Sequence, residues 1–230
     1  MSDRALTIVE GWRDRLAAAG LNTLDALLTL DRGRVRSAHD RGRLREVELP
    51  DGGTVFVKCA LSTTFKQVAG DLMSFRHPEP LSEKERVGIE RARALGIVTA
   101  EVIAWGQRRR GGWPWQGVLV MDRLAGVPLN AWLAAGPEAP RRRAVLGDVG
   151  RTIAALYRGG FSWPDLRVKH IFVDEDGRIG LLDLERLRPC RWAVRRWLPG
   201  HVRRLCRALR DAGADEGDLA ALRDGLSRRG

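Results

Sequence analysis

A histidine and two aspartates surround a short predicted hairpin in the second half of the chain. Asp165 and His170 precede the apolar run at 171–173, and a second apolar run at 179–182 ends directly before Asp183. Short runs of β-branched and aromatic residues separated by a turn are typical of two paired strands. We therefore expect the polar groups at the outer ends of the hairpin to lie close together.

A bound cation would explain such a cluster. Carboxylates that lie close together repel each other unless a positive charge lies between them. Mg²⁺ takes oxygen ligands and a few waters, and it is usually shared with substrate phosphates. Asp165, His170 and Asp183 thus predict a magnesium-dependent phosphate chemistry, although histidine is a less ordinary magnesium ligand than asparagine. A turn or cap residue is the alternative for any one of the aspartates taken alone.

A lysine in the first half of the chain is the next candidate. Lys58 lies on a predicted strand and has apolar residues on both sides. An ammonium group at a buried strand needs an anionic partner, and a phosphate or a carboxylate would serve. Glu85, on a helix predicted from about 83 to 95, is the candidate carboxylate, and Glu83 and Glu90 on the same helix compete with it. The alternative for Lys58 is an edge-strand lysine that faces water.

The composition is that of a globular protein with an excess of positive charge. The chain has 230 residues, of which 44% are hydrophobic and 30% charged, and its net charge is +11. Three widely spaced cysteines without a CxxC pair argue against a disulfide framework or a zinc site and favour a reducing compartment. A charged N-terminal stretch without an apolar run predicts no secretory signal, and no apolar stretch is long enough to span a membrane.

The pattern of apolar residues predicts strands mainly in the first half and helices mainly in the second. Helices are predicted over 4–19, 83–95 and 141–157, and a short one in the stretch TLDALLTL with Asn22 and Asp25 as caps. The predicted strands are 44–49, 55–57, 100–107 and 116–122, and the polar stretch 61–80 is predicted to be a loop. From Pro189 onward the chain is predicted to be helical, with a break at Pro199–Gly200. This segregation predicts a two-lobed α+β protein with a cleft between the lobes.

The order of these residues resembles the protein-kinase signature. The stretch VFVK resembles V-A-I-K, DLRVKH resembles D-L-x-x-x-N with His170 in the Asn position, and LLDLE resembles the region of D-F-G. More closely, the chain is similar to the lipopolysaccharide core kinases, the family of Kdo kinase, WaaP heptose kinase and InaA-like proteins. The similarity covers most of residues 14–187, including ERVGIERARALGIVTAEVIAWG and LAAAGLNTLDALL.

The resemblance implies a two-lobed protein-kinase-like fold that transfers the γ-phosphoryl group of ATP to a sugar hydroxyl of Kdo or heptose in the lipopolysaccharide core. It implies an N-terminal helical extension at 1–29, a small β-rich N-lobe at 30–124, and a mainly helical C-lobe with a basic tail at 125–230. The resemblance implies that Lys58, held by Glu85, contacts the α- and β-phosphates. It implies that Asp165 accepts the proton of the attacking hydroxyl and that His170 and Asp183 hold Mg²⁺. The hinge that meets adenine is implied to consist of Met121, Asp122 and Leu124.

Some positions depart from the kinase pattern. The stretch DRGRVRSAHDRGR offers Gly33 and Gly42 but no G-x-G-x-x-G, so arginines are candidates to hold phosphate there. Trp163 and Pro164 occupy the positions of His and Arg in H-R-D. No A-P-E segment follows Asp183, which favours a small-molecule or glycolipid acceptor over a peptide. Two alternatives stay open: a kinase for a soluble acceptor, and a catalytically inactive kinase-like module that binds polyanions.

The C-terminal part of the chain is strongly basic. Nine arginines and no acid lie between Arg186 and Arg210, close in sequence to Trp192 and Trp197. A basic amphipathic helix with tryptophans is typical of a surface that binds an anionic membrane, and the phosphates of a lipopolysaccharide core are an equal candidate. An ordinary helix with a solvated face is the plainer alternative. We expect a cytoplasmic protein at the inner face of the inner membrane, with ATP and a lipid-linked saccharide as partners and no nucleic acid.

Overall fold

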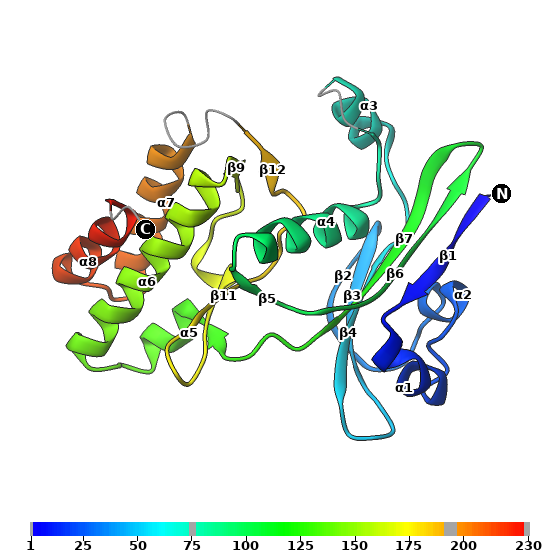
Figure 1. Ribbon diagram of the computed structural model, residues 1–230, viewed down its shortest axis with the longest axis horizontal. Helices are drawn as coiled ribbons and strands as arrows, with labels where there is room; N and C mark the ends of the chain where they lie inside the picture. Colours follow the sequence, from blue (N-terminus) through cyan, green and yellow to red (C-terminus); the bar gives the residue numbers. More distant parts are fainter. Residues whose placement is uncertain (1, 74–76, 191–196, 228–230) are drawn as a thin grey trace. The chain divides into compact units, whose positions relative to one another are not determined.

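The computed structural model describes residues 2–73, 77–190 and 197–227 (Figure 1). The chain forms two compact units, which we call unit 1 and unit 2. Unit 1 comprises Met1–Val87 and Glu101–Arg123, and unit 2 comprises Gly88–Ala100 and Leu124–Gly230. The chain therefore passes between the units three times, the last time directly after Arg123.

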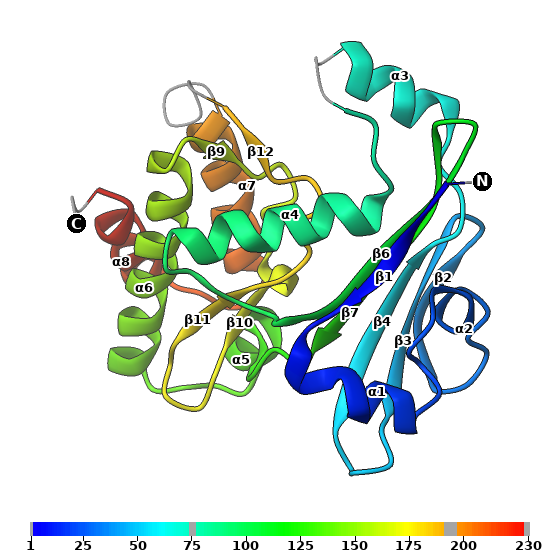
Figure 2. The same cartoon turned by 45° about the vertical axis from the view of Figure 1, so that its right-hand side comes forward.

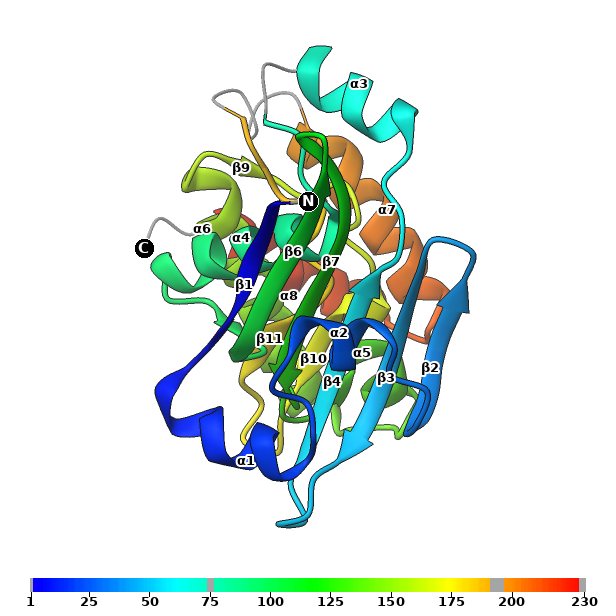
Figure 3. The same cartoon turned by 90° about the vertical axis from the view of Figure 1, so that its right-hand side faces the viewer.

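Unit 1 is built on an antiparallel sheet that has six strands within the described residues, in the order β1-β6-β7-β4-β3-β2 (Figure 3). The strands are β1 (Ser2–Ile8), β2 (Arg34–His39), β3 (Gly42–Glu48), β4 (Thr54–Ala60), β6 (Val102–Arg110) and β7 (Trp113–Asp122). The predicted hairpins at 44–57 and 100–122 are confirmed. They correspond to β3–β4 and β6–β7.

The alternation along β4 decides where Lys58 points. Val55, Val57 and Cys59 are buried in the hydrophobic core that one face of the sheet shares with two short helices, α1 (Arg13–Ala18) and α2 (Leu24–Leu28) (Figure 2). Because successive side chains of a strand point to opposite faces, Lys58 lies on the other face of the sheet. Its cross-strand neighbours Leu44 and Leu119 share that face.

Two more helices belong wholly or partly to unit 1. Helix α3 (Phe65–Met73) lies within the stretch that was predicted to be a loop, so that prediction is wrong. The helix has only nine residues and prolines follow it, so the helical spacing of its apolar residues is hard to recognise in the sequence. Helix α4 (Leu81–Ala94) confirms the predicted helix at 83–95, and its residues from Gly88 onward belong to unit 2.

Unit 2 combines small sheets with four helices within the described residues. One sheet has the order β5-β11-β10-β8 and contains the predicted hairpin as β10 (Ile171–Val173) and β11 (Ile179–Leu181). The other strands are β5 (Val98–Thr99), β8 (Val127–Pro128), β9 (Phe161–Ser162) and β12 (Arg188–Pro189), and the helices are α5 (Leu129–Ala134), α6 (Ala139–Arg158), α7 (Leu198–Asp211) and α8 (Glu216–Ser227). The short 3-10 helices are η1 (Glu10–Trp12) in unit 1 and η2 (Val168–His170) in unit 2.

Three local predictions are wrong. Residues 4–8 of the predicted helix at 4–19 lie in β1, because pairing with β6 satisfies their backbone groups, and the helix begins only at Arg13. Thr23, rather than the predicted Asn22, caps α2 by accepting a hydrogen bond from the backbone N–H of Ala26 at 3.1 Å. Pro199–Gly200 does not break α7 but lies in its first turn, where a proline costs no intrahelical hydrogen bond. Whether residues 1–29 act as a separate extension stays a prediction.

Close contact between α6 and α8 stabilises unit 2. The Nε of Arg142 on α6 lies 2.5 Å from a carboxylate oxygen of the fully buried Asp218 on α8. Further along, the two helices approach each other at Gly150 and Gly225, where no side chain separates the backbones. None of the helices in the described residues has the length and apolar character needed to cross a membrane.

Replacing Gly150 by alanine should therefore destabilise the protein. A Cβ atom at Gly150 would lie 2.3 Å from the carbonyl oxygen of Leu222, and backbone does not move aside easily. We expect Gly150→Ala to lower the free energy of unfolding by about 1–3 kcal/mol, measured by urea unfolding. The matched control is Gly200→Ala in α7, where no described atom outside its own helix and chain neighbours lies within 4 Å of the new Cβ. Equal stability of the two variants would contradict the prediction.

Candidate active site

Unit 1 brings Lys58 and Glu85 together. The Nζ of Lys58 on β4 lies 2.5 Å from Oε2 of Glu85 on α4. The glutamate side chain is 3% exposed and the lysine side chain 24% exposed, so the carboxylate is buried while the lysine side chain is partly exposed. Of the competing acids, Glu83 forms its ion pair with Arg86 at 2.6 Å.

Unit 2 brings Asp165, His170 and Asp183 together around the predicted hairpin. The Nδ1 of His170 lies 2.9 Å from the backbone carbonyl oxygen of Asp165, and Nε2 lies 3.5 Å from Oδ2 of Asp183. A carbonyl oxygen only accepts, so Nδ1 carries the proton, and in the neutral ring Nε2 offers a lone pair on the side of Asp183. The carboxylate of Asp165 contacts Arg186, with 3.2 Å between Oδ1 and Nη1.

Trp163 connects the loop of Asp165 to the end of the hairpin. Its side chain is fully buried, and its indole N–H donates to the backbone carbonyl of Asp183 at 3.2 Å. Asp183 has a φ of 61°, a left-handed conformation that residues other than glycine adopt uncommonly. The indole therefore holds a backbone group of the residue whose conformation is the most unusual in this loop.

A second buried contact links the same loop to helices α6 and α7. The hydroxyl of Tyr157 lies within hydrogen-bonding distance of Nδ1 of His201 and of the backbone of Trp163. Burial raises the pKa of Tyr157 to about 12 and lowers the pKa of His201, which Arg204 and Arg188 lower further. Arg204 also donates to the carbonyl of Pro164 at 3.2 Å. The start of α7 thus supports the loop that carries Asp165.

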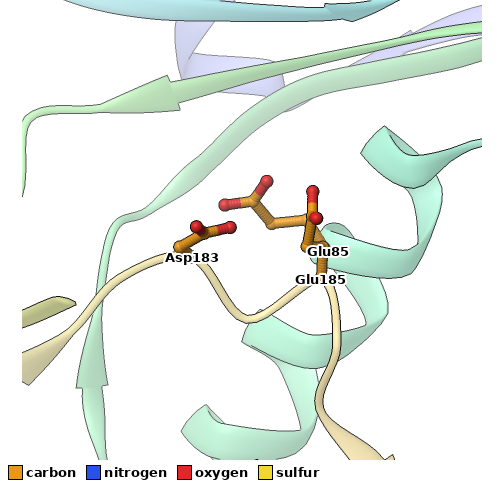
Figure 4. Close-up of side chains that lie close together, drawn as sticks. All are labelled: Glu85, Asp183 and Glu185. Carbon is orange, nitrogen blue, oxygen red and sulfur yellow. The ribbon is translucent and has the colours of Figure 1, made fainter. Parts of the chain in front are cut away.

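Sequence reasoning missed one acidic residue of this region. Asp183 and Glu185 extend from the same segment after β11 (Figure 4), and ligand oxygens of the two side chains lie within 4.8 Å of each other. Glu185 occupies the position of glycine in D-F-G, so the kinase pattern assigned it no role. Its spacing of two residues from Asp183 was the available signal, because two carboxylates at that spacing can share a cation.

The predicted hinge residues lie where the chain leaves unit 1. Met121 is buried near the end of β7, and the backbone N–H of Asp122 donates to the carbonyl of Glu101 at 2.9 Å. Leu124 is the first residue of the second segment of unit 2, and it packs on Gly180 of β11. Residues 121–124 therefore include the last passage between the units.

The segment in the position of the glycine-rich loop is a tight hairpin. Positions 39 and 42 pair at the end of β2 and β3, which leaves only two residues in the turn between them. Arg43 and Arg45 on β3 donate to backbone carbonyls of the preceding segment, at Leu28 and at Arg32 and Gly33 respectively. These arginines serve the fold of unit 1.

The comparisons with known proteins agree with the resemblance found in the sequence. The family model described as the lipopolysaccharide kinase (Kdo/WaaP) family matches residues 25–225. This chain belongs to that family. The prediction of the family is thus confirmed.

Individual relatives give the same picture. The lipopolysaccharide core heptose(I) kinase WaaP of Pseudomonas aeruginosa is 24% identical over 159 residues, which cover 64% of this chain and 59% of WaaP. The O-antigen chain terminator bifunctional methyltransferase/kinase WbdD of Escherichia coli is 36% identical over 88 residues, which cover 38% of this chain and 12% of WbdD. The chain therefore matches less than two thirds of the length of these curated relatives.

A solved structure confirms the fold. WaaP in complex with acyl carrier protein matches with a TM-score of 0.75 and 21% identity, over 98% of this chain and 89% of that chain. The predicted fold class, a kinase-like α+β fold with a β-rich first part and a helical second part, is confirmed.

The buried His201 should make stability depend on pH. The folded state lowers the pKa of His201 below the value of about 6.5 that a histidine has in the unfolded chain. As the pH falls below that value, the unfolded chain binds a proton that the folded protein does not, so stability is lost. We expect the free energy of unfolding to fall from about pH 7 to about pH 5, and to fall less in His201→Asn, measured by urea unfolding. An unchanged pH dependence in the variant would contradict this.

Proposed function

We propose that this protein is an ATP- and Mg²⁺-dependent kinase that phosphorylates a sugar hydroxyl, of Kdo or heptose, in the core or a precursor of lipopolysaccharide. The observation that carries the proposal is the family match over residues 25–225 in a chain that keeps the Lys58–Glu85 pair and the cluster around Asp183. A residue set that is retained and engaged in contacts favours an enzyme over an inactive module.

The proposed role of unit 1 is to bind the nucleotide. Lys58 would contact the α- and β-phosphates, because its side chain is partly exposed and its direction is fixed by Glu85. The backbone of Met121, Asp122 and Leu124 would meet adenine. A hinge role suits these residues because the chain passes from one unit to the other there.

The proposed role of the hairpin in unit 2 is to hold magnesium. The donor set fits the ion, because Asp183 and Glu185 offer carboxylate oxygens and His170 offers Nε2, while Mg²⁺ prefers oxygen and keeps several waters. The ion would neutralise charge on the β- and γ-phosphates. Because the two carboxylates supply the oxygen ligands, the main role of His170 would be its hydrogen bond to the backbone carbonyl of Asp165, which holds the loop of Asp165 in place.

Asp165 is the proposed base. Its carboxylate would accept the proton of the sugar hydroxyl while the hydroxyl oxygen bonds to the γ-phosphorus and the bond from phosphorus to the ADP oxygen breaks. Arg186 donates a hydrogen bond to the same carboxylate at 3.2 Å.

Two alternatives to a lipopolysaccharide kinase stay open, and the first is a catalytically inactive kinase-like module. The tight turn between β2 and β3 favours weak nucleotide binding, which is also what an inactive module would show. A kinase for a soluble acceptor is the other alternative.

An inner-membrane substrate would place the protein at the cytoplasmic face of that membrane. The acyl carrier protein bound to WaaP makes a homologous carrier protein a candidate partner.

Loss of Asp165 should abolish the modification. In a strain that lacks this gene, we expect mass spectrometry of the lipopolysaccharide to show one phosphate fewer. The wild-type gene should restore that phosphate and Asp165→Asn should not, because the general base contributes about 10²–10⁴ in rate. The matched control is Asp176→Asn in the exposed turn of the hairpin, which should restore it. An unchanged lipopolysaccharide in the deletion strain would refute the proposed acceptor.

Trp163 should be a positioning residue that acts through Asp183. Trp163→Phe and Trp163→His both remove volume, but only histidine retains an N–H that can donate, and it is the residue of the H-R-D pattern at this position. Leaving the carbonyl of Asp183 unpaired costs about 1–3 kcal/mol, so we expect Trp163→Phe to lower kcat about tenfold or more.

The histidine variant separates positioning from packing. It should keep a higher kcat than Trp163→Phe, with a similar KM for ATP and a similar melting temperature in the two variants. Equal kcat values in both variants would mean that the indole matters only for packing.

A further inference from the structure

Helix α3 buries Asp71 together with Val68 and exposes three large apolar side chains. Phe65, Leu72 and Met73 are 76%, 59% and 84% exposed, whereas Asp71 is 3% exposed. Soluble helices normally bury the apolar face and expose the charged one. Large exposed apolar side chains that gather on one element mark a surface that another molecule covers.

Specific contacts fix this orientation of α3 in unit 1. The buried carboxylate of Asp71 lies 2.6 Å from the ammonium of Lys84 on α4. The ring of Phe65 stacks on that of Trp113 on β7, with 6.2 Å between centroids and 15° between planes. Just before α3, Thr63 accepts a hydrogen bond from the indole of Trp113 and donates one to the carbonyl of Trp115. Helix α3 therefore lies beside the end of the β6–β7 hairpin (Figure 2).

Exposed cations and a tryptophan lie on α3 and at the end of the β6–β7 hairpin. Lys66 and Arg110 are exposed, and the guanidinium of Arg110 lies 5.9 Å from the ring centroid of the 37% exposed Trp115. Two acids of this region are neutralised, since Asp71 pairs with Lys84 and Glu79 pairs with Arg109 at 2.8 Å. Within the described part of α3 and of the hairpin end, the exposed Lys66 and Arg110 carry positive charge.

We propose that these residues form a surface, the α3 patch, that binds an anionic lipid bilayer. The patch consists of Phe65, Lys66, Leu72, Met73, Arg110 and Trp115. The apolar and aromatic side chains would enter the boundary between headgroups and acyl chains, and the cations would contact lipid phosphates. A second copy of the chain is the poorer occupant, because a symmetric contact would bring Lys66 and Arg110 of both copies face to face. The inference rests on the membrane location in the proposed function, and because vesicle binding needs neither ATP nor a sugar acceptor, its failure can be told apart from failure of the proposed kinase activity.

Sedimentation of the purified full chain with vesicles tests the proposal. We expect binding to vesicles of phosphatidylglycerol and phosphatidylethanolamine and much weaker binding to phosphatidylcholine alone. Phe65→Ser/Leu72→Ser/Met73→Ser should lower the apparent affinity at least tenfold. The matched control is Val35→Ser/Val98→Ser/Val127→Ser, which changes three valines that are 46–50% exposed elsewhere on the chain and should leave binding unchanged.

A charge variant keeps the test decisive if the serine variant fails to fold. Lys66→Gln/Arg110→Gln should weaken binding to the anionic vesicles and reduce its dependence on salt, with an unchanged melting temperature. Binding that survives both patch variants but is lost in Arg203→Gln/Arg207→Gln would overturn the proposal in favour of the α7 surface. A wild-type dimer that the serine variant turns into a monomer, with vesicle binding unchanged, would overturn it in favour of self-association.

Discussion

The buried carboxylate of Glu85 sets a demanding electrostatic condition in unit 1. A charged glutamate that is 3% exposed is stable only beside a cation, and Lys58 supplies it from the adjacent strand. Removing one partner of such a pair costs more than the pair contributes, because the other charge stays buried. The pair therefore fixes α4 against the sheet and gives a long, flexible lysine one direction. A lysine held in this way loses little further entropy when it binds phosphate, which is the property a nucleotide site needs.

Unit 2 positions its polar groups by a different means, through the backbone. His170 holds the carbonyl of Asp165, the indole of Trp163 holds the carbonyl of Asp183, and the N–H of Leu182 donates to the carbonyl of His170 at 2.9 Å. These bonds compensate for the left-handed backbone at Asp183, which would be costly without support. Gly88 on α4 allows that helix to reach the same segment, since a Cβ there would lie 2.2 Å from the carbonyl oxygen of Leu184.

The sequence predicted the strands and helices in which the periodic spacing of apolar residues matches the buried face of the element. Alternation around Val55 and Val57 identified β4, and the short apolar runs around the turn identified β10 and β11. Prediction failed where tertiary contacts outweigh local pattern. Residues 2–8 form a strand because β6 offers an edge, and α3 is stabilised by Lys84 and Trp113, which are distant in sequence. Glu185 was missed because the kinase pattern assigns metal binding to the position of Asp183 and no role to the position of Glu185.

The net charge of +11 says less about binding than the positions of the individual cations do. Several arginines are used within the fold. Arg32 and Arg43 donate to the carbonyls of Ala19 and Leu28 after α1 and at the end of α2, and Arg142 pairs with the buried Asp218. Carbonyls at helix ends lack intrahelical partners, so these guanidinium groups stabilise the helices of a small unit. A cation contributes to specific binding of an external polyanion only where it is exposed and where neighbouring groups also contact the ligand. Exposed arginines on α7 meet the first condition, as do Lys66 and Arg110, and in the proposed α3 patch the exposed apolar side chains supply the second.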